Sequence, residues 1–149
     1  MRVSGVHHTS YTVANLERSL EFYCDLLGCQ VIWRREITDR YFRAIVAFSD
    51  SVVNGAQLRI PGSDHILELF AYVQPRGQAV DMNTHNPGNS HLCFLVDDLQ
   101  AAYAGLSTAG VEFKSPPVAV DVGANAGALA AYLVDPDGIS EELFQPRVG

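Results

Sequence analysis

The sequence predicts an α+β fold in which two paired βαβββ modules form a cupped mixed sheet. Two observations lead to this prediction. The chain repeats its motifs, and within each copy the hydrophobic pattern changes between the period of a strand and that of a helix. With 149 residues, 48% of them hydrophobic and 18% charged, the chain has the size and composition of one globular domain.

A histidine opens each copy of the repeat, and a Glu-Leu-Phe triplet closes it. The triplet that begins at Glu68 follows His8 by 60 residues, and the triplet that begins at Glu142 follows His91 by 51. Matching residue types at both ends of both copies indicate that the two copies fold alike.

The repeat divides residues 1–149, expected to form a single domain, into two modules. The first module spans about residues 4–74 and the second about residues 90–147. Residues 75–89 are rich in Pro, Gly and Asn, which is typical of a loop, and are predicted to link the modules.

The elements of the first module follow from its spacing. Residues 6–13 alternate as a strand does, and Asn15 is a good N-cap for a helix that Gly28 ends. The apolar stretches that follow predict four strands, at residues 30–36, 43–49, 56–60 and 65–73.

The second module is expected to repeat this order. Residues 90–96 predict a strand, and Leu99 begins a helix that extends to Ala109. Short strands are predicted after it, at residues 111–114, 128–134 and 140–145.

Charge and composition narrow the classes of partner. A net charge of −7 argues against nucleic acid or an anionic membrane surface. No apolar run reaches the about 18 residues of a membrane span, and the N-terminus lacks the apolar core of a signal peptide. Cys24, Cys29 and Cys93 do not cluster as zinc ligands and are expected to be free thiols. We therefore expect a cytoplasmic protein.

Strand alternation places the repeated polar residues on common faces. His8 shares a face with Ser10 and Thr12, and Glu68 shares one with Phe70 and Tyr72. A carboxylate that enters an apolar strand is costly to bury unless it has a partner. Pairing of the modules about a pseudo-twofold axis would bring together two imidazoles and two carboxylates, from His8, Glu68, His91 and Glu142.

This set of side chains predicts a site for a divalent metal ion. Imidazole nitrogens and carboxylate oxygens suit Fe, Mn, Ni, Co or Zn, with Fe or Mn favoured. Taken singly, such a histidine is more often a structural residue and such a glutamate more often lies at a strand edge in water, and the repetition is what favours the metal site. His7, His65 and Glu141 fall on the opposite strand face or at an edge, and His85 lies in the predicted linker.

Four segments of the chain resemble the vicinal oxygen chelate superfamily, which includes glyoxalases, bleomycin-resistance proteins and extradiol dioxygenases. They are HHTSYTV, LELF, SHLCFLVDDLQAA and YLVDPDGISEELFQP. In such proteins the glutamate seven residues after the aspartate that opens the DPDG turn, here Asp135, is a metal ligand. The resemblance thus assigns this role to Glu142, although the neighbouring Glu141 leaves the register open by one residue. It further implies paired βαβββ modules around the metal, and commonly a homodimer, in which the metal site of some members is assembled across the interface.

The resemblance leaves several activities open. An apolar lining is predicted near the ligands, from Phe70, Tyr72, Leu95, Tyr132 and Phe144. It suits a flat, oxygenated small molecule with adjacent oxygens, such as a polyketide or phenol, and favours a metal-dependent oxygenase or dioxygenase. The first alternative is a redox-neutral glyoxalase- or epimerase-type isomerase or lyase, in which an enolate forms on the metal and Glu68 or Glu142 moves the proton. The second alternative is a non-catalytic binding or resistance protein.

Overall fold

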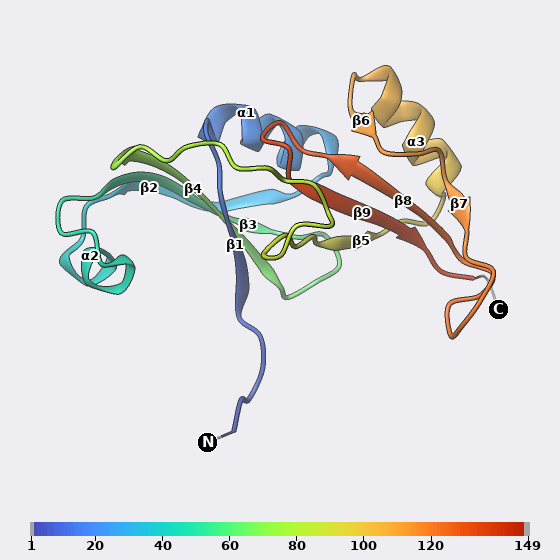
Figure 1. Ribbon diagram of the computed structural model, residues 1–149, viewed down its shortest axis with the longest axis horizontal. Coiled ribbons are helices and arrows are strands. Elements are labelled where there is room, and N and C mark those ends of the chain that lie inside the picture. Colours follow the sequence, from blue (N-terminus) through green and yellow to red (C-terminus); the bar gives the residue numbers. More distant parts are fainter. Residues whose placement is uncertain (1, 148–149) are drawn as a thin grey trace. The chain divides into compact units, whose positions relative to one another are not determined.

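The computed structural model describes residues 2–147 and divides into two compact units between Ala79 and Val80. Each unit contains one mixed sheet, and the strands are labelled in Figure 1. The strand order is β1-β4-β3-β2 in the first unit and β5-β9-β8-β6 in the second, with β7 added beside β8. The α+β class predicted from the sequence is confirmed.

The first unit places helices on both faces of its sheet. Its elements are β1 (His8–Thr12), α1 (Leu16–Leu20), η1 (Glu21–Leu26), β2 (Gln30–Ile37), α2 (Arg40–Val46), β3 (Val52–Arg59) and β4 (Ile66–Gln74). β1 runs parallel to β4, and the other neighbouring strands are antiparallel. η1 continues α1 as a π-helix, so the single helix expected here widens after its first turns.

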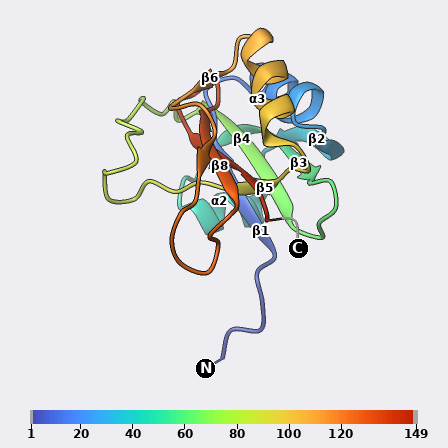
Figure 2. The ribbon, with the colours of Figure 1, turned by 90° about the vertical axis from the view of Figure 1, so that its right-hand side faces the viewer.

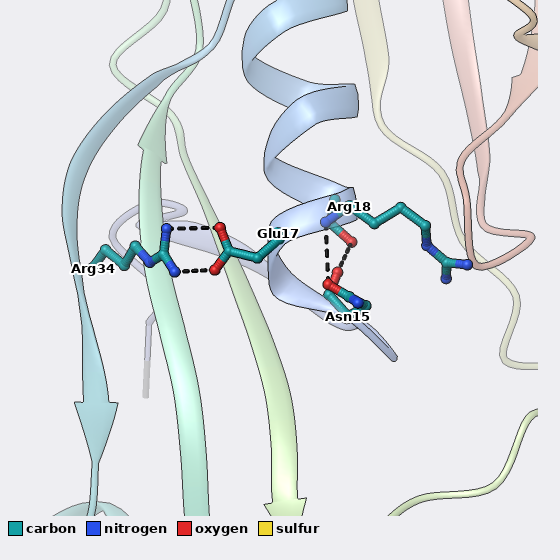
Figure 3. Close-up of polar contacts among 5 residues, drawn as sticks. Asn15, Glu17, Arg18 and Arg34 are labelled. Atoms are coloured by element: carbon teal, nitrogen blue, oxygen red, sulfur yellow. Dashed lines mark hydrogen bonds and ion pairs between the residues drawn. The ribbon is translucent and has the colours of Figure 1, made fainter.

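Local polar contacts fix the start of α1 (Figure 3). The Asn15 side chain accepts a hydrogen bond from the backbone N–H of Arg18 at 3.2 Å, which satisfies one unpaired donor of the first turn. Glu17 forms a two-pronged ion pair with Arg34 of β2. Both side chains of that pair are exposed, so the pair contributes little to the stability of the protein.

The core of the first unit lies on the α1 face of the sheet. Leu58, Leu67 and Leu69 are fully buried, and α1 contacts both β3 and β4. Because side chains alternate along β4, Glu68, Phe70 and Tyr72 project from the opposite face. The hydrophobic core thus fixes which face carries the polar residues.

The prediction of a strand at residues 43–49 is wrong, because this segment belongs largely to α2 and the next strand, β3, begins at Val52. Phe42 and Val46 are four residues apart, so both point to one side of α2, where they pack against Ile37 and Val53. A short apolar run does not by itself distinguish a strand from a buried helix. The result is a second apolar cluster on the Glu68 face of the sheet.

The second unit follows the predicted order more closely. Its elements are β5 (Cys93–Leu95), α3 (Leu99–Thr108), β6 (Glu112–Phe113), β7 (Val118–Ala119), β8 (Leu129–Val134) and β9 (Ser140–Gln145). Asp98 caps α3, which is labelled in Figure 2, by accepting the Ala101 N–H at 2.9 Å, and α3 contacts β8 and β9. β7 was not expected from the sequence.

Two details affect the site. Asp135 Oδ1 accepts the backbone N–H groups of Asp137 at 2.8 Å and Ile139 at 2.7 Å, which folds the DPDG turn that leads into β9. β5 is shorter than the expected strand 90–96, so His91 lies two residues before it.

Residues 75–92 contain neither helix nor strand. Among the helices of residues 2–147, none has the length and apolar character needed to cross a bilayer.

Candidate functional site

The first unit brings His8 and Glu68 together on one face of its sheet. Glu68 lies beside Ser10 in the β1–β4 register, and His8 is two residues earlier on β1. The distance between His8 Nε2 and Glu68 Oε2 is 3.3 Å. The Glu68 side chain is 11% exposed and that of His8 41%, so the carboxylate is buried while the imidazole reaches solvent.

Two further side chains hold this pair. Gln57 of β3 is the register partner of Glu68, and its Nε2 donates to Glu68 Oε1 at 2.6 Å. At the other end, His7 Nδ1 lies 2.7 Å from His8 Nδ1. The first unit therefore contains a continuous chain of four polar side chains, His7–His8–Glu68–Gln57.

The second unit repeats the His–Glu pair. His91 Nε2 lies 3.2 Å from Glu142 Oε2, at nearly the same distance as in the first unit. Tyr132 is the register partner of Glu142 on β8, the position that Gln57 has relative to Glu68. Its hydroxyl, however, lies 3.2 Å from His91 Nε2, and its ring packs edge-on against the imidazole at 4.9 Å between centroids.

Neutral hydrogen-bond donors surround Glu142. Burial, the charge of Glu142 and a hydrogen bond to it raise the pKa of the Cys93 thiol to about 11. Burial and the charges of Glu142 and Cys93 likewise raise the pKa of the Tyr132 hydroxyl. Both groups keep their protons at neutral pH, so each can donate a hydrogen bond beside Glu142.

The adjacent carboxylates, Glu141 and Glu142, have different surroundings. Glu141 is fully buried, and its Oε2 accepts the backbone N–H of Leu92 at 3.0 Å. It lies on the same side of β9 as Leu143, whereas Glu142 lies on the side that faces His91. The carboxylate beside the histidine is thus that of Glu142.

The donor atoms of both pairs suit a divalent cation. Each pair combines one imidazole nitrogen with one carboxylate oxygen, a mixed set that transition metals of the first row accept. The ion-pair partner that the structure gives the buried Glu68 within residues 2–147 is the half-exposed His8, so a cation there would compensate its charge. No group of three or more histidine, cysteine, aspartate or glutamate side chains that could hold a metal ion occurs among residues 2–147, and each unit presents one His–Glu pair.

The five residues predicted to line the site have different positions. Phe70 and Tyr72 pack into the apolar cluster under α2, and the Phe70 ring meets that of Phe42 at 5.4 Å. Leu95 is 73% exposed, and Phe144 and Tyr132 are partly buried on the Glu142 face of the second sheet. Phe70 and Tyr72 thus lie on the Glu68 face of the sheet and also pack against α2.

Gln57 was not predicted from the sequence as a site residue. Its role can be recognised only from the register of the paired strands, which places it beside Glu68. Gln57 and Tyr132 differ in chemistry, and nothing in the repeat of letters aligns them. Only the pairing of β3 with β4 and of β8 with β9 shows that they are equivalent neighbours of the two glutamates. His65, a weaker candidate, instead contacts Thr9 Oγ1 at 2.9 Å.

These strand-borne pairs and the DPDG turn occur within a segment that matches a known family. Residues 5–143 match the Glyoxalase/Bleomycin resistance protein/Dioxygenase superfamily. The chain belongs to this superfamily. Members act on small molecules, typically with a divalent metal ion, and many are enzymes, which agrees with the broader expectation of a metal-dependent enzyme but does not test the expected oxygenase.

Individual relatives carry lyase and epimerase names. The chain is 30% identical to a lactoylglutathione lyase from Pseudomonas aeruginosa, over 93% of this chain and 81% of the relative. It is 28% identical to a 2-epi-5-epi-valiolone epimerase from an Actinomyces species, over 97% of this chain and 81% of that relative. Among solved structures, a glyoxalase family protein from Bacillus cereus matches this chain with a TM-score of 0.84 at 17% sequence identity. The match covers 99% of this chain and 97% of that protein, and it shows that the two share a fold.

Proposed function

We propose that the protein is a divalent-metal-dependent isomerase, epimerase or lyase that moves a proton at a carbon next to a carbonyl group. The observation that carries this proposal is the repeated His–Glu pair, with nitrogen–oxygen distances of 3.3 Å in one unit and 3.2 Å in the other. His8, Glu68, His91 and Glu142 would hold one cation, either within one chain or between the chains of a homodimer.

A bound Fe, Mn, Ni, Co or Zn ion supplies Lewis acidity, which stabilises negative charge on a substrate oxygen. Four protein ligands leave about two positions on a six-coordinate ion. A substrate with two adjacent oxygens fills both. This count favours a reaction that needs no third external ligand, and it is the reason to prefer proton transfer over oxygen chemistry.

The carboxylates of Glu68 and Glu142 are the groups that move the proton in this proposal. Glu142 is the better placed, because its side chain is more exposed, at 18% against 11% for Glu68, and because Glu68 already accepts the Gln57 amide at 2.6 Å. The neutral Tyr132 hydroxyl and Cys93 thiol beside Glu142 are donors that hold a substrate oxygen in place. The lyase and epimerase names of the relatives support the same class of reaction.

Isotope exchange tests the proposal. The protein loaded with Mn²⁺ or Ni²⁺ is incubated without oxygen in deuterated water with 2-hydroxycyclohexanone, and with the hemithioacetal of methylglyoxal and glutathione. We expect deuterium at the carbon next to the carbonyl by mass spectrometry, and at least a hundredfold slower exchange for Glu142→Gln. Exchange that is equal in the parent, the variant and the buffer contradicts the proposal for these substrate classes.

The oxygenase favoured from the sequence is the second candidate. The observation in its favour is the apolar surface that Leu95 and Phe144 form on the Glu142 face of the second sheet. It predicts oxygen uptake by the Fe²⁺-loaded protein with a dihydroxyaromatic such as catechol, measured with an oxygen electrode. A binding protein without catalysis would instead hold such a ligand equally well with and without a chelator.

A further inference from the structure

We infer that the two His–Glu pairs, here called half-sites, are not equivalent. The first, His8–Glu68, is already arranged for the metal by Gln57. The second, His91–Glu142, must lose its contact with Tyr132 before it can bind the metal. This inference rests on the proposed function, because it concerns the same four ligands. Gln57 is a positioning residue, since it would act on the metal through its hydrogen bond to Glu68.

The contrast begins with which atom each neighbour contacts. Gln57 Nε2 donates to Glu68 Oε1, while it is Oε2 that faces His8. The hydrogen bond from Gln57 therefore uses the Glu68 oxygen that does not face His8. A cation can take Oε2 and His8 Nε2 while the Gln57 contact stays in place.

Tyr132 stands at the matching position of the second sheet but makes a different contact. Its hydroxyl lies 3.2 Å from His91 Nε2, the nitrogen that faces Glu142. Metal binding needs the lone pair of that nitrogen, so Nε2 can then neither donate a hydrogen bond to the hydroxyl nor accept one from it. Loading of the second half-site therefore breaks the Tyr132–His91 contact and leaves the hydroxyl free beside Glu142.

Burial points in the same direction. Glu68 is 11% exposed, with its rotamer held between β3 and β1, whereas Glu142 is 18% exposed. Side chains held by outer hydrogen bonds lose less freedom when a metal binds, and removal of such a partner typically weakens binding by roughly 10- to 100-fold. The Gln57 amide should thus strengthen metal binding, whereas the Tyr132 hydroxyl should not.

Mn²⁺ titration of the full chain, followed by the electron paramagnetic resonance of free Mn²⁺, tests this difference. Gln57→Met keeps the side-chain volume but removes the donor, and we expect a loss of affinity of about 10- to 100-fold. Tyr132→Phe should bind Mn²⁺ as tightly as the parent or more tightly. Gln100→Met is the matched control, because Gln100 is exposed on α3. It should not change the affinity.

Unfolding in the presence of EDTA separates positioning from support of the fold. A purely structural role of Gln57 predicts lower stability of the metal-free protein with unchanged affinity. If Gln57→Met melts below the assay temperature, Gln57→Asn gives the same comparison, because its shorter amide cannot span the 2.6 Å contact.

Two results overturn the inference: an affinity of Gln57→Met within twofold of the parent, or an equal loss in Tyr132→Phe. Failure of the proposed function looks different, because His8→Ala and Glu142→Ala would then bind Mn²⁺ as the parent does.

Discussion

Replacement of each of the two adjacent glutamates of β9 should affect a different property: mainly stability for Glu141, and mainly metal binding for Glu142. Glu141 is fully buried and accepts the Leu92 N–H at 3.0 Å, while Glu142 faces His91. Glu141→Ala removes this hydrogen bond and leaves the backbone donor unpaired, which costs about 3 kcal/mol of unfolding free energy. For a chain of this size, that loss lowers Tm by roughly 6–12 °C.

Glu142→Ala should behave differently, because its carboxylate supports no backbone donor that the structure describes. We expect a loss of less than about 1 kcal/mol in the metal-free protein, as for most partly exposed positions. Metal affinity, in contrast, should fall steeply, because half of the second pair is gone. Glu141→Gln provides a graded control, since its amide oxygen still accepts the Leu92 N–H.

The assay is urea unfolding in EDTA, followed by circular dichroism, so that bound metal does not contribute to stability. Mn²⁺ titration of the same samples gives the affinity. Equal destabilisation by Glu141→Ala and Glu142→Ala would refute this reasoning, and so would a loss of Mn²⁺ binding confined to Glu141→Ala.

Two further predictions concern the first unit. A Cβ at Gly55 would lie 2.5 Å from Ile37 Cδ1 and 3.1 Å from Phe70 Cδ1, so Gly55→Ala should overpack the cluster under α2 and cost about 1–3 kcal/mol in urea unfolding; an unchanged midpoint would contradict that packing. Asn15→Ala removes the cap of α1 and should cost about 1 kcal/mol, whereas Asn15→Asp, which keeps the acceptor, should cost less than half as much.

The order of elements was predictable where sequence pattern and turn chemistry agree. Asn15, Gly28 and the DPDG turn are local signals, so their helix and strand ends followed from the sequence. The segment that became α2 was not predictable, because its apolar residues suit a strand as well as a helix. Packing of Phe42 on Ile37 and Val53 decides between the two.

The site was predictable as a pair of motifs but not as a set of contacts. Repetition of a histidine and a Glu-Leu-Phe triplet identified His8, Glu68, His91 and Glu142 as candidates. The alternation of β9 cannot by itself say which of two adjacent glutamates faces the core, and burial of Glu141 supplies that answer. Gln57 needed the β3–β4 register, which no single-strand pattern contains.

We propose that one His–Glu pair from each unit holds the same divalent cation. Electron paramagnetic resonance tests this proposal by giving the stoichiometry and affinity of Mn²⁺ for the parent, for His8→Ala and for His91→Ala. We expect one tightly bound Mn²⁺ per chain, and at least a hundredfold weaker binding in each variant, although the two histidines belong to different units. Parent-like binding in either variant would contradict it.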